Sequence, residues 1–293
     1  LVMHLHQAAG DVSPAGAGGL DCEGLSPCFD FARSEAIGRR ARDAILATWE
    51  AAVPAMTDTL AMEMVTRTIS LGPDLSAITA RQGALSYLPF EEGRMPDGVI
   101  FDEAGEVATP IDEFNVAFGA GLCGEEDGGL GAGIPGAREL GPYQTCSRVE
   151  DVVNLLRLGI GDDWYFEDPL PSCASTRTTL SALRLGEHLL VTLPGEPVNP
   201  LVDRMRQAAP VAGDALIVLG YAQDHMGYLL HADDWLRGGY EPSINIWGPI
   251  EGEYIAEASL DLARAALSPE REDATTSTGR ALPGPFSRDV SPD

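Results

Sequence analysis

The chain has 293 residues, of which 44% are hydrophobic, which is enough apolar material for one large domain or two small ones. Its formal net charge is −26 at pH 7, and all 19 basic residues are arginine because the sequence contains no lysine. Phosphate binding needs clustered positive charge, so this balance argues against nucleic acid as a partner and against electrostatic docking on anionic membranes. Two explanations of the acidity stay open, solubility and a high-salt habitat, and the base composition of the source genome can account for arginine without lysine.

The cysteines bear on the compartment. All five lie in segments with the composition of loops, at Cys22, Cys28, Cys123, Cys146 and Cys173. None of them forms a CxxC pair, which argues against a zinc-ribbon site. Cysteines in loops fit disulfides in an oxidising compartment better than a reduced core, so we expect a secreted, cell-surface or periplasmic protein. Cys22 and Cys28 are the favoured pair, and the odd count leaves one thiol over.

The N-terminal part of the chain predicts a strand, a helix and a second strand. Residues 1–6 read as a strand that is already inside a fold, so we expect the N-terminal part of the natural protein to be missing. The segment GDVSP at residues 10–14 reads as a turn, and a Gly-rich loop follows. Ser34 reads as the N-cap of a helix to about residue 52, before Pro54. Residues 60–71 alternate like a half-exposed strand, with one face formed by Leu60, Met62 and Met64 and the other by Glu63 and Arg67.

The rest of the chain predicts a mixture of strands and helices. Residues 72–173 are irregular apart from a helix at 149–158, as in a segment that covers a site or an interface. A β-hairpin over 179–193, a helix over 199–209, a strand over 215–219 and a helix over 251–267 then follow. We therefore expect an α/β fold of mixed β-sheets flanked by helices, forming one catalytic domain over residues 1–267, with a polar tail or linker over 268–293.

The most informative stretch is residues 220–240, GYAQDHMGYLLHADDWLRGGY. It follows an apolar strand and gathers two histidines, three aspartates and several tyrosines. A strand that ends in a cluster of ionisable groups is where α/β enzymes usually place their chemistry. The segments GDVSP at 10–14 and LPGE at 193–196 both point toward it.

Each candidate residue also has a purely structural interpretation. Glu196 can ligate a metal, or it can cap the helix that begins within about three residues. Tyr228 and Tyr240 can be packing aromatics, and Ser13 can be a plain turn serine, since no neighbouring residue identifies a base for it.

Together these motifs resemble the catalytic domain of the neutral, non-lysosomal ceramidases. The resemblance rests on the order GDVSP, LPGE, the two Gly-Tyr pairs at 220–221 and 227–228, Tyr240, and Trp247-Gly-Pro249. It covers residues 1–35 and 178–265, with scattered matches such as the segment FGAGL at 118–122 between them. These are zinc-dependent amidases that cleave N-acyl sphingosine, so the resemblance implies a zinc amidohydrolase with a ceramide-like lipid substrate and Zn²⁺ as cofactor.

The resemblance also implies a role for each matching residue. Glu196 and Tyr228 take the positions of zinc ligands, Tyr240 that of a tyrosine contacting the reacting amide, and Ser13 that of the active-site serine. Ser13 is either a nucleophile or a hydrogen-bond partner of substrate or water, and we favour the second role. His225 and His231 are then bystanders.

The zinc site implied by the resemblance is not complete in this chain. The family's two zinc-binding histidines and an arginine lie before the GDVSP motif, where this chain offers only His4 and His6. Nothing after residue 267 reads as strands, so we do not expect the family's C-terminal immunoglobulin-like domain in this stretch. A missing N-terminal segment or a second chain would complete the site.

Two alternatives to ceramide hydrolysis follow from this departure. One is a catalytically inactive segment that binds lipid or a partner. The other is an amidase for another N-acyl substrate.

Overall fold

A four-stranded mixed sheet forms the centre of the protein. The computed structural model describes residues 5–12, 22, 30–71, 77–88, 97–114, 121–123, 146–148, 177–243, 245 and 247–268. Within them the strand order is β1-β6-β7-β9, where β1 is Met62–Ser70, β6 Arg177–Leu185, β7 His188–Thr192 and β9 Leu216–Leu219. The first three strands are antiparallel, and β9 runs parallel to β7. This arrangement confirms the predicted α/β class and the hairpin around Gly186.

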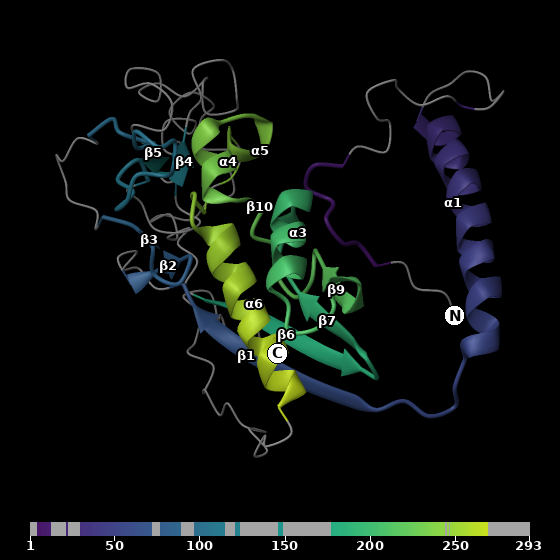
Figure 1. Cartoon of the computed structure of the whole chain (residues 1–293). Helices are drawn as coiled ribbons and strands as arrows, with labels where there is room; N and C mark the ends of the chain where they lie inside the picture. Colours follow the sequence, from purple (N-terminus) through teal and green to yellow (C-terminus); the bar gives the residue numbers. More distant parts are fainter. Residues whose placement is uncertain are drawn as a thin grey trace, which may run out of the picture.

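Two helices cover one face of this sheet (Figure 1). Helix α6, Glu251–Leu267, packs across β6, β1 and β7, and α3, Asn199–Ala208, packs beside it. The helical spacing of Ile255, Leu262 and Ala266 places all three in the core, as predicted for this helix. Burying each large apolar side chain in such a core contributes about 1.5–3 kcal/mol. The sheet and these two helices therefore form the stable platform on which the remaining segments lie.

Three two-stranded sheets and several short helices complete the described fold. The strand pairs are β2 Thr79–Ala80 with β3 Leu85–Ser86, β4 Gly121–Cys123 with β5 Cys146–Arg148, and β8 Glu196–Pro197 with β10 Tyr228–Leu229. The short helices are η1 Val53–Ala55, η4 Gly213–Ala215, α4 Ala232–Arg237 and α5 Tyr240–Ser243. Among the described residues, no helix is both long and apolar enough to cross a membrane.

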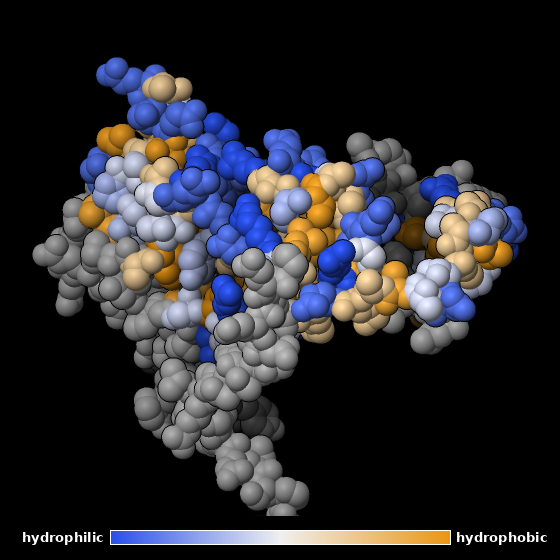
Figure 2. Space-filling model, turned by 60° about the horizontal axis from the view of Figure 1, so that its bottom comes forward, coloured by the Kyte–Doolittle hydropathy of each residue, from blue (hydrophilic) through white to orange (hydrophobic). Residues whose placement is uncertain are grey.

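Helix α1, Asp30–Ala52, stands apart from the sheet (Figure 1). It begins at Asp30, so the prediction that Ser34 is the N-cap is wrong, and Ser34 lies inside the first turns. Large apolar side chains on this helix and on the turn after it are exposed, with Trp49 at 56% and Met56 at 54%. Figure 2 shows tan and orange patches on the projecting part at the right.

Strand β1 alternates between two faces as predicted from its sequence, but the face that carries Met62 and Met64 is the exposed one. Met62 and Met64 are exposed at 66% and 55%, while Ile69 and, in part, Val65 face the core. The apolar face of the first half of the strand is thus turned away from α6, because α6 packs on the opposite side of the sheet.

Several predicted features lie outside the described residues. They are Ser13, His4, Cys28, Cys173, the helix expected at 149–158 and the tail from residue 269 onward. The strand expected over residues 1–6 is not formed at Leu5 and His6, although the His6 carbonyl accepts a hydrogen bond from the Gly220 N–H at 3.0 Å. Cys22 is buried and disulfide-bonded, in agreement with the expectation that loop cysteines form disulfides.

Candidate active site

The LPGE turn and the second Gly-Tyr pair lie side by side as the parallel pair β8–β10. Its register places Glu196 opposite Tyr228. The Glu196 N–H donates to the Gly227 carbonyl at 2.7 Å, and the Val198 N–H donates to the Leu229 carbonyl at 3.2 Å. Two residues that are 32 positions apart in the sequence are therefore neighbours at one edge of the fold.

The strands β7 and β9 bring these two segments together. The strands run parallel, so their carboxyl ends meet at one edge, where the Leu193 N–H donates to the Leu219 carbonyl at 2.7 Å. Beyond that point the two loops stay in contact, since the Tyr221 N–H donates to the Gly195 carbonyl and the Met226 N–H to the Pro194 carbonyl, both at 2.7 Å. The polar cluster after the strand thus lies at the strand ends, as expected from its sequence.

Tyr240 lies against Tyr228. Their ring centroids are 6.3 Å apart at an interplanar angle of 70°, which is an edge-to-face contact. Burial first, and then the nearby charge of Glu196, raise the pKa of the Tyr228 phenol. Tyr240 is 65% exposed, so one side of the pair is open to solvent. A protonated phenol at this position is a hydrogen-bond donor for a polar group that approaches from solvent.

The Tyr228 backbone is held from behind by a buried asparagine. Asn245 is 1% exposed; its side-chain NH₂ donates to the Tyr228 carbonyl, and its side-chain carbonyl accepts from the Trp247 N–H at 2.8 Å. Gly227 has a φ of +68°, and a Cβ at this position would lie 2.8 Å from the Trp247 ring. This position therefore requires glycine, both for its backbone conformation and for the close approach of the indole.

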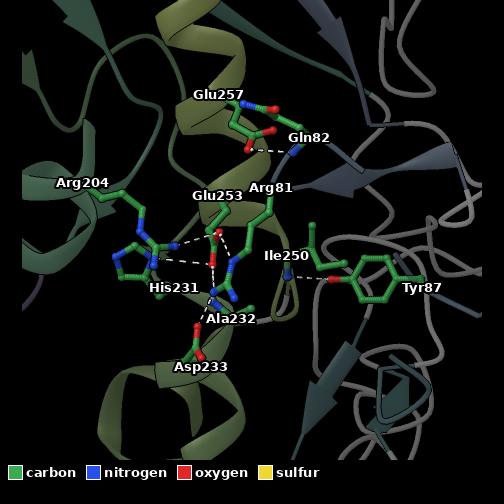
Figure 3. A network of polar contacts seen from close by, with 10 residues as sticks. All are labelled: Arg81, Gln82, Tyr87, Arg204, His231, Ala232, Asp233, Ile250, Glu253 and Glu257. Atoms are coloured by element: carbon green, nitrogen blue, oxygen red, sulfur yellow. Dashed lines mark hydrogen bonds and ion pairs between the residues drawn. The ribbon is translucent and has the colours of Figure 1, made fainter. Parts of the chain in front are cut away.

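A polar network centred on Glu253 holds α4, the helix that connects Tyr228 to Tyr240 (Figure 3). Glu253 is 4% exposed and accepts from Arg81 Nε and Nη2 and from the Ala232 N–H at 3.1 Å. Arg81 also bonds Asp233 in the first turn of α4, and His231 Nδ1 lies 3.5 Å from Glu253 Oε1. The start of α4, on the path from Tyr228 to Tyr240, is thereby tied to α6.

The GDVSP segment meets the other side of β8. The Gly10 N–H donates to the Pro197 carbonyl at 3.1 Å, and a Cβ on Gly10 would lie 2.6 Å from the Glu196 carbonyl oxygen. Asp11 Oδ1 accepts from both the backbone N–H and the side-chain amide of Asn199 at 2.9 Å, so it caps the first turn of α3 from a distance. Capping of this helix was one interpretation of Glu196, and it is Asp11 that caps the helix. Ser13 lies outside the described residues.

His225, which was interpreted as a bystander, and Tyr221, which was assigned no role, lie beside Glu196. His225 Nε2 is 3.4 Å from Glu196 Oε1. The pKa of Tyr221 is raised to about 12 by burial first and then by the neighbouring Glu196 carboxylate. His6 contacts the Tyr221 ring edge-on, with centroids 5.5 Å apart. In the sequence, only the first Gly-Tyr pair and the histidine four residues after Tyr221 indicate the contact with Glu196.

The donors gathered here fit part of a zinc site. Zinc in proteins takes carboxylate oxygen and imidazole nitrogen at about 2.0–2.2 Å. Glu196 and Tyr228 offer two oxygen donors from facing positions of β8 and β10, and the Glu196 side chain is half-buried, with 22% of it exposed. The histidines implied by the resemblance belong before residue 10, and there the described histidine, His6, packs on Tyr221.

A separate group of carboxylates lies at the loop over residues 97–114. The carboxylate oxygens of Asp97, Asp112 and Glu113 lie within 4.8 Å of one another and can hold a cation. Burial first, and then the charge of Asp112, raise the pKa of Glu113 to about 7. The same carboxylates also accept backbone N–H groups of the loop, for example Asp97 N–H to Asp112 Oδ2 at 3.1 Å and Asp112 N–H to Glu113 Oε2 at 3.2 Å. These hydrogen bonds within the loop are enough to explain why the three carboxylates lie together, without a cation.

The solved structures found to be similar to this chain include two ceramidases. One is the neutral ceramidase from Pseudomonas aeruginosa, with 18% identity, a TM-score of 0.47, and coverage of 84% of this chain and 35% of that one. The other is a ceramidase complexed with C2, with 14% identity, a TM-score of 0.37, and coverage of 70% and 30%. This chain therefore spans about a third of the length of each. No protein-family model and no curated protein matches the chain.

Proposed function

We propose that this chain is the C-terminal part of the catalytic domain of a ceramidase-like enzyme that hydrolyses the amide bond of an N-acyl sphingosine. The observation that carries the proposal is the convergence of three separate motifs. Glu196 and Tyr228 face each other on β8 and β10, Tyr240 packs on Tyr228, and Gly10 of GDVSP packs on Glu196. Because both TM-scores are below 0.5, we base the proposal on these motifs and contacts.

In this proposal Glu196 and Tyr228 are two ligands of a zinc ion. A zinc ion held there supplies Lewis-acid polarisation of the amide carbonyl and of the attacking water. Water adds to the carbonyl carbon, the C–N bond breaks, and the amine nitrogen takes a proton, which gives a fatty acid and sphingosine. Tyr240 donates a hydrogen bond to the developing oxyanion or to the leaving amine, and Ser13 hydrogen-bonds substrate or water.

The remaining parts of the proposal concern completeness and compartment. A segment before residue 1 or a second chain supplies the other zinc ligands. The disulfide at Cys22 supports a secreted, cell-surface or periplasmic protein. Residues 1–267 are proposed as one catalytic domain and 268–293 as its tail or linker.

The test is zinc content together with amide cleavage. The chain, together with the segment or second chain that completes its site, is assayed for bound zinc and for release of fatty acid from an acyl-labelled ceramide. We expect Glu196→Ala to lower both zinc affinity and cleavage by about 100-fold or more, since removing even an outer partner of a zinc ligand costs 10–100-fold. Glu187→Ala, at the exposed hairpin turn, is the matched control and should change neither.

Other outcomes select the alternatives. Lipid binding without zinc or cleavage would favour an inactive binding segment. Cleavage of other N-acyl compounds but not of ceramide would identify an amidase of different specificity.

A further inference from the structure

The Glu196 carboxylate lies in a cradle formed by the loop that follows β9. This loop, residues 220–227, returns to the LPGE turn through three backbone hydrogen bonds: from Tyr221 to Gly195, from Ala222 to Leu193 and from Met226 to Pro194, at 2.7, 3.1 and 2.7 Å. Its ends are thus fixed to the turn that carries Glu196. The cradle consists of this loop and residues 193–196.

The loop holds its residues in a costly conformation. Tyr221 has a φ of +55° and Gln223 a φ of +75°, both in the left-handed region that disfavours non-glycine residues. Each such residue costs of order 1–3 kcal/mol and persists where the surrounding structure over-determines it. Here the hydrogen bonds to the turn do so, and they fix the Tyr221 backbone against Gly195, next to Glu196.

His225 completes the cradle with a defined tautomer. Its Nδ1 accepts a hydrogen bond from the Gly227 N–H at 3.3 Å, so the ring proton of the neutral imidazole is on Nε2. That Nε2 is the atom 3.4 Å from Glu196 Oε1. The Tyr221 and His225 rings also contact each other, with centroids 5.8 Å apart. An Nε2–H at this position is a donor toward the carboxylate and is not free to ligate a metal.

We propose that Tyr221 and His225 are positioning residues that orient the Glu196 carboxylate by donating to it. This inference rests on the proposed function, because the orientation matters only if Glu196 ligates zinc. One carboxylate oxygen is held by the cradle, and the other is left for the zinc ion. Donors behind a ligating group fix its geometry and raise its effectiveness as a ligand. The cradle thus orients the Glu196 side chain, while Asn245 and Trp247 fix the backbone at Tyr228.

The first test measures zinc affinity of the full chain by competition with a chromophoric chelator. Tyr221→Phe and His225→Ala should each weaken zinc binding by about 10–100-fold, while His225→Gln, which keeps an N–H near the Nε2 position, should restore most of the loss. The matched controls are Tyr254→Phe, which removes a hydroxyl bonded to the Ser70 carbonyl, and His188→Ala at the exposed hairpin end. Wild-type affinity in both Tyr221→Phe and His225→Ala would overturn the inference.

The second test needs no metal. Nitrogen-15 NMR of the metal-free chain should show His225 protonated at Nε2 and unprotonated at Nδ1, and Tyr221→Phe should shift the carboxyl carbon of Glu196. An Nδ1–H tautomer or an unmoved Glu196 signal would contradict the cradle. If the wild-type chain binds no zinc while both NMR signatures are present, the proposed zinc function fails and the positioning contacts stand.

Discussion

At the scale of single residues, the site depends on a few positions that admit only one residue type. Gly227 is the clearest, because its backbone is in the left-handed region and the Trp247 indole occupies the space of a side chain. Tyr228, the next residue, inherits its direction from this geometry. Gly227, which has no side chain, is therefore needed to place Tyr228, a zinc ligand in our proposal.

Replacing Gly227 by alanine should destabilise the protein by about 2 kcal/mol, since a left-handed backbone costs an ordinary residue roughly 1–2 kcal/mol and the indole must also shift. Urea unfolding followed by circular dichroism measures this difference. Gly38→Ala is the matched control, because Gly38 lies on α1 with open space around it; there alanine should stabilise by about 0.5–1 kcal/mol. Equal effects of the two substitutions would contradict the role assigned to Gly227.

At the scale of elements, the Glu253 network decides where α4 lies. Arg81 comes from the turn after β2, Arg204 from α3, and Ala232 and Asp233 from α4, and all contact one buried carboxylate or its partner (Figure 3). Burial alone would raise the pKa of Glu253, but the neighbouring His231 and the hydrogen bonds from Arg81 and the Ala232 N–H hold it well below its ordinary value. The folded state therefore favours the ionised form of Glu253.

Arg81→Met should cost about 3 kcal/mol at pH 7, because removing one partner of a buried ion pair leaves the other uncompensated. Arg39→Met on α1 breaks only the exposed pair with Glu35 and should cost less than about 1 kcal/mol. Unfolding free energies from urea titration make the comparison, and similar costs for both variants would show that the network is not a structural tie.

The Glu253 network also predicts that the free energy of unfolding decreases at acid pH. A carboxyl with a lowered folded pKa contributes stability that is present above its unfolded pKa and is lost as pH falls toward the folded value. The contribution of Glu253 should therefore decline below about pH 4.5, the ordinary glutamate value. In a pH series, Arg81→Met should show a weaker decline than the wild type, and an identical decline would assign the acid sensitivity to other groups.

At the scale of the whole molecule, charge and exposed apolar surface dominate. The net charge of −26 makes the folded chain repel itself, and few arginines are available to offset it. Apolar side chains of α1 and β1 are exposed in the same molecule, among them Trp49, Met62 and Met64. The described fold thus has a compact sheet-and-helix centre and a helix that adds little to its core.

Added salt should stabilise the protein. Screening shortens the Debye length from about 30 Å at 0.01 M to about 3 Å at 1 M, which weakens the repulsion between carboxylates more than it weakens the buried Glu253 contacts. The urea midpoint should rise with sodium chloride concentration. A falling midpoint would mean that surface ion pairs outweigh the net repulsion.

The sequence by itself determined most elements and the class of the fold. Periodicity located α3, α6, the β6–β7 hairpin and β9 within a residue or two, because local hydrophobic spacing reports directly which face of an element is buried. Motif order singled out Glu196, Tyr228 and Tyr240 as a set. The start of α1 was misplaced, because Asp30 and Ser34 are both acceptable helix starts by residue type.

Only the tertiary structure decided which segments meet. Several contacts join residues that are far apart in the sequence. They are the parallel pairing of β8 with β10, the capping of α3 by Asp11, and the contacts of Tyr221 and His225 with Glu196, which depend on an irregular loop. The exposed face of β1 was likewise decided by the side on which α6 packs. Local patterns carry no information on such long-range choices, because many pairings satisfy the same periodicity and only the packed core selects among them.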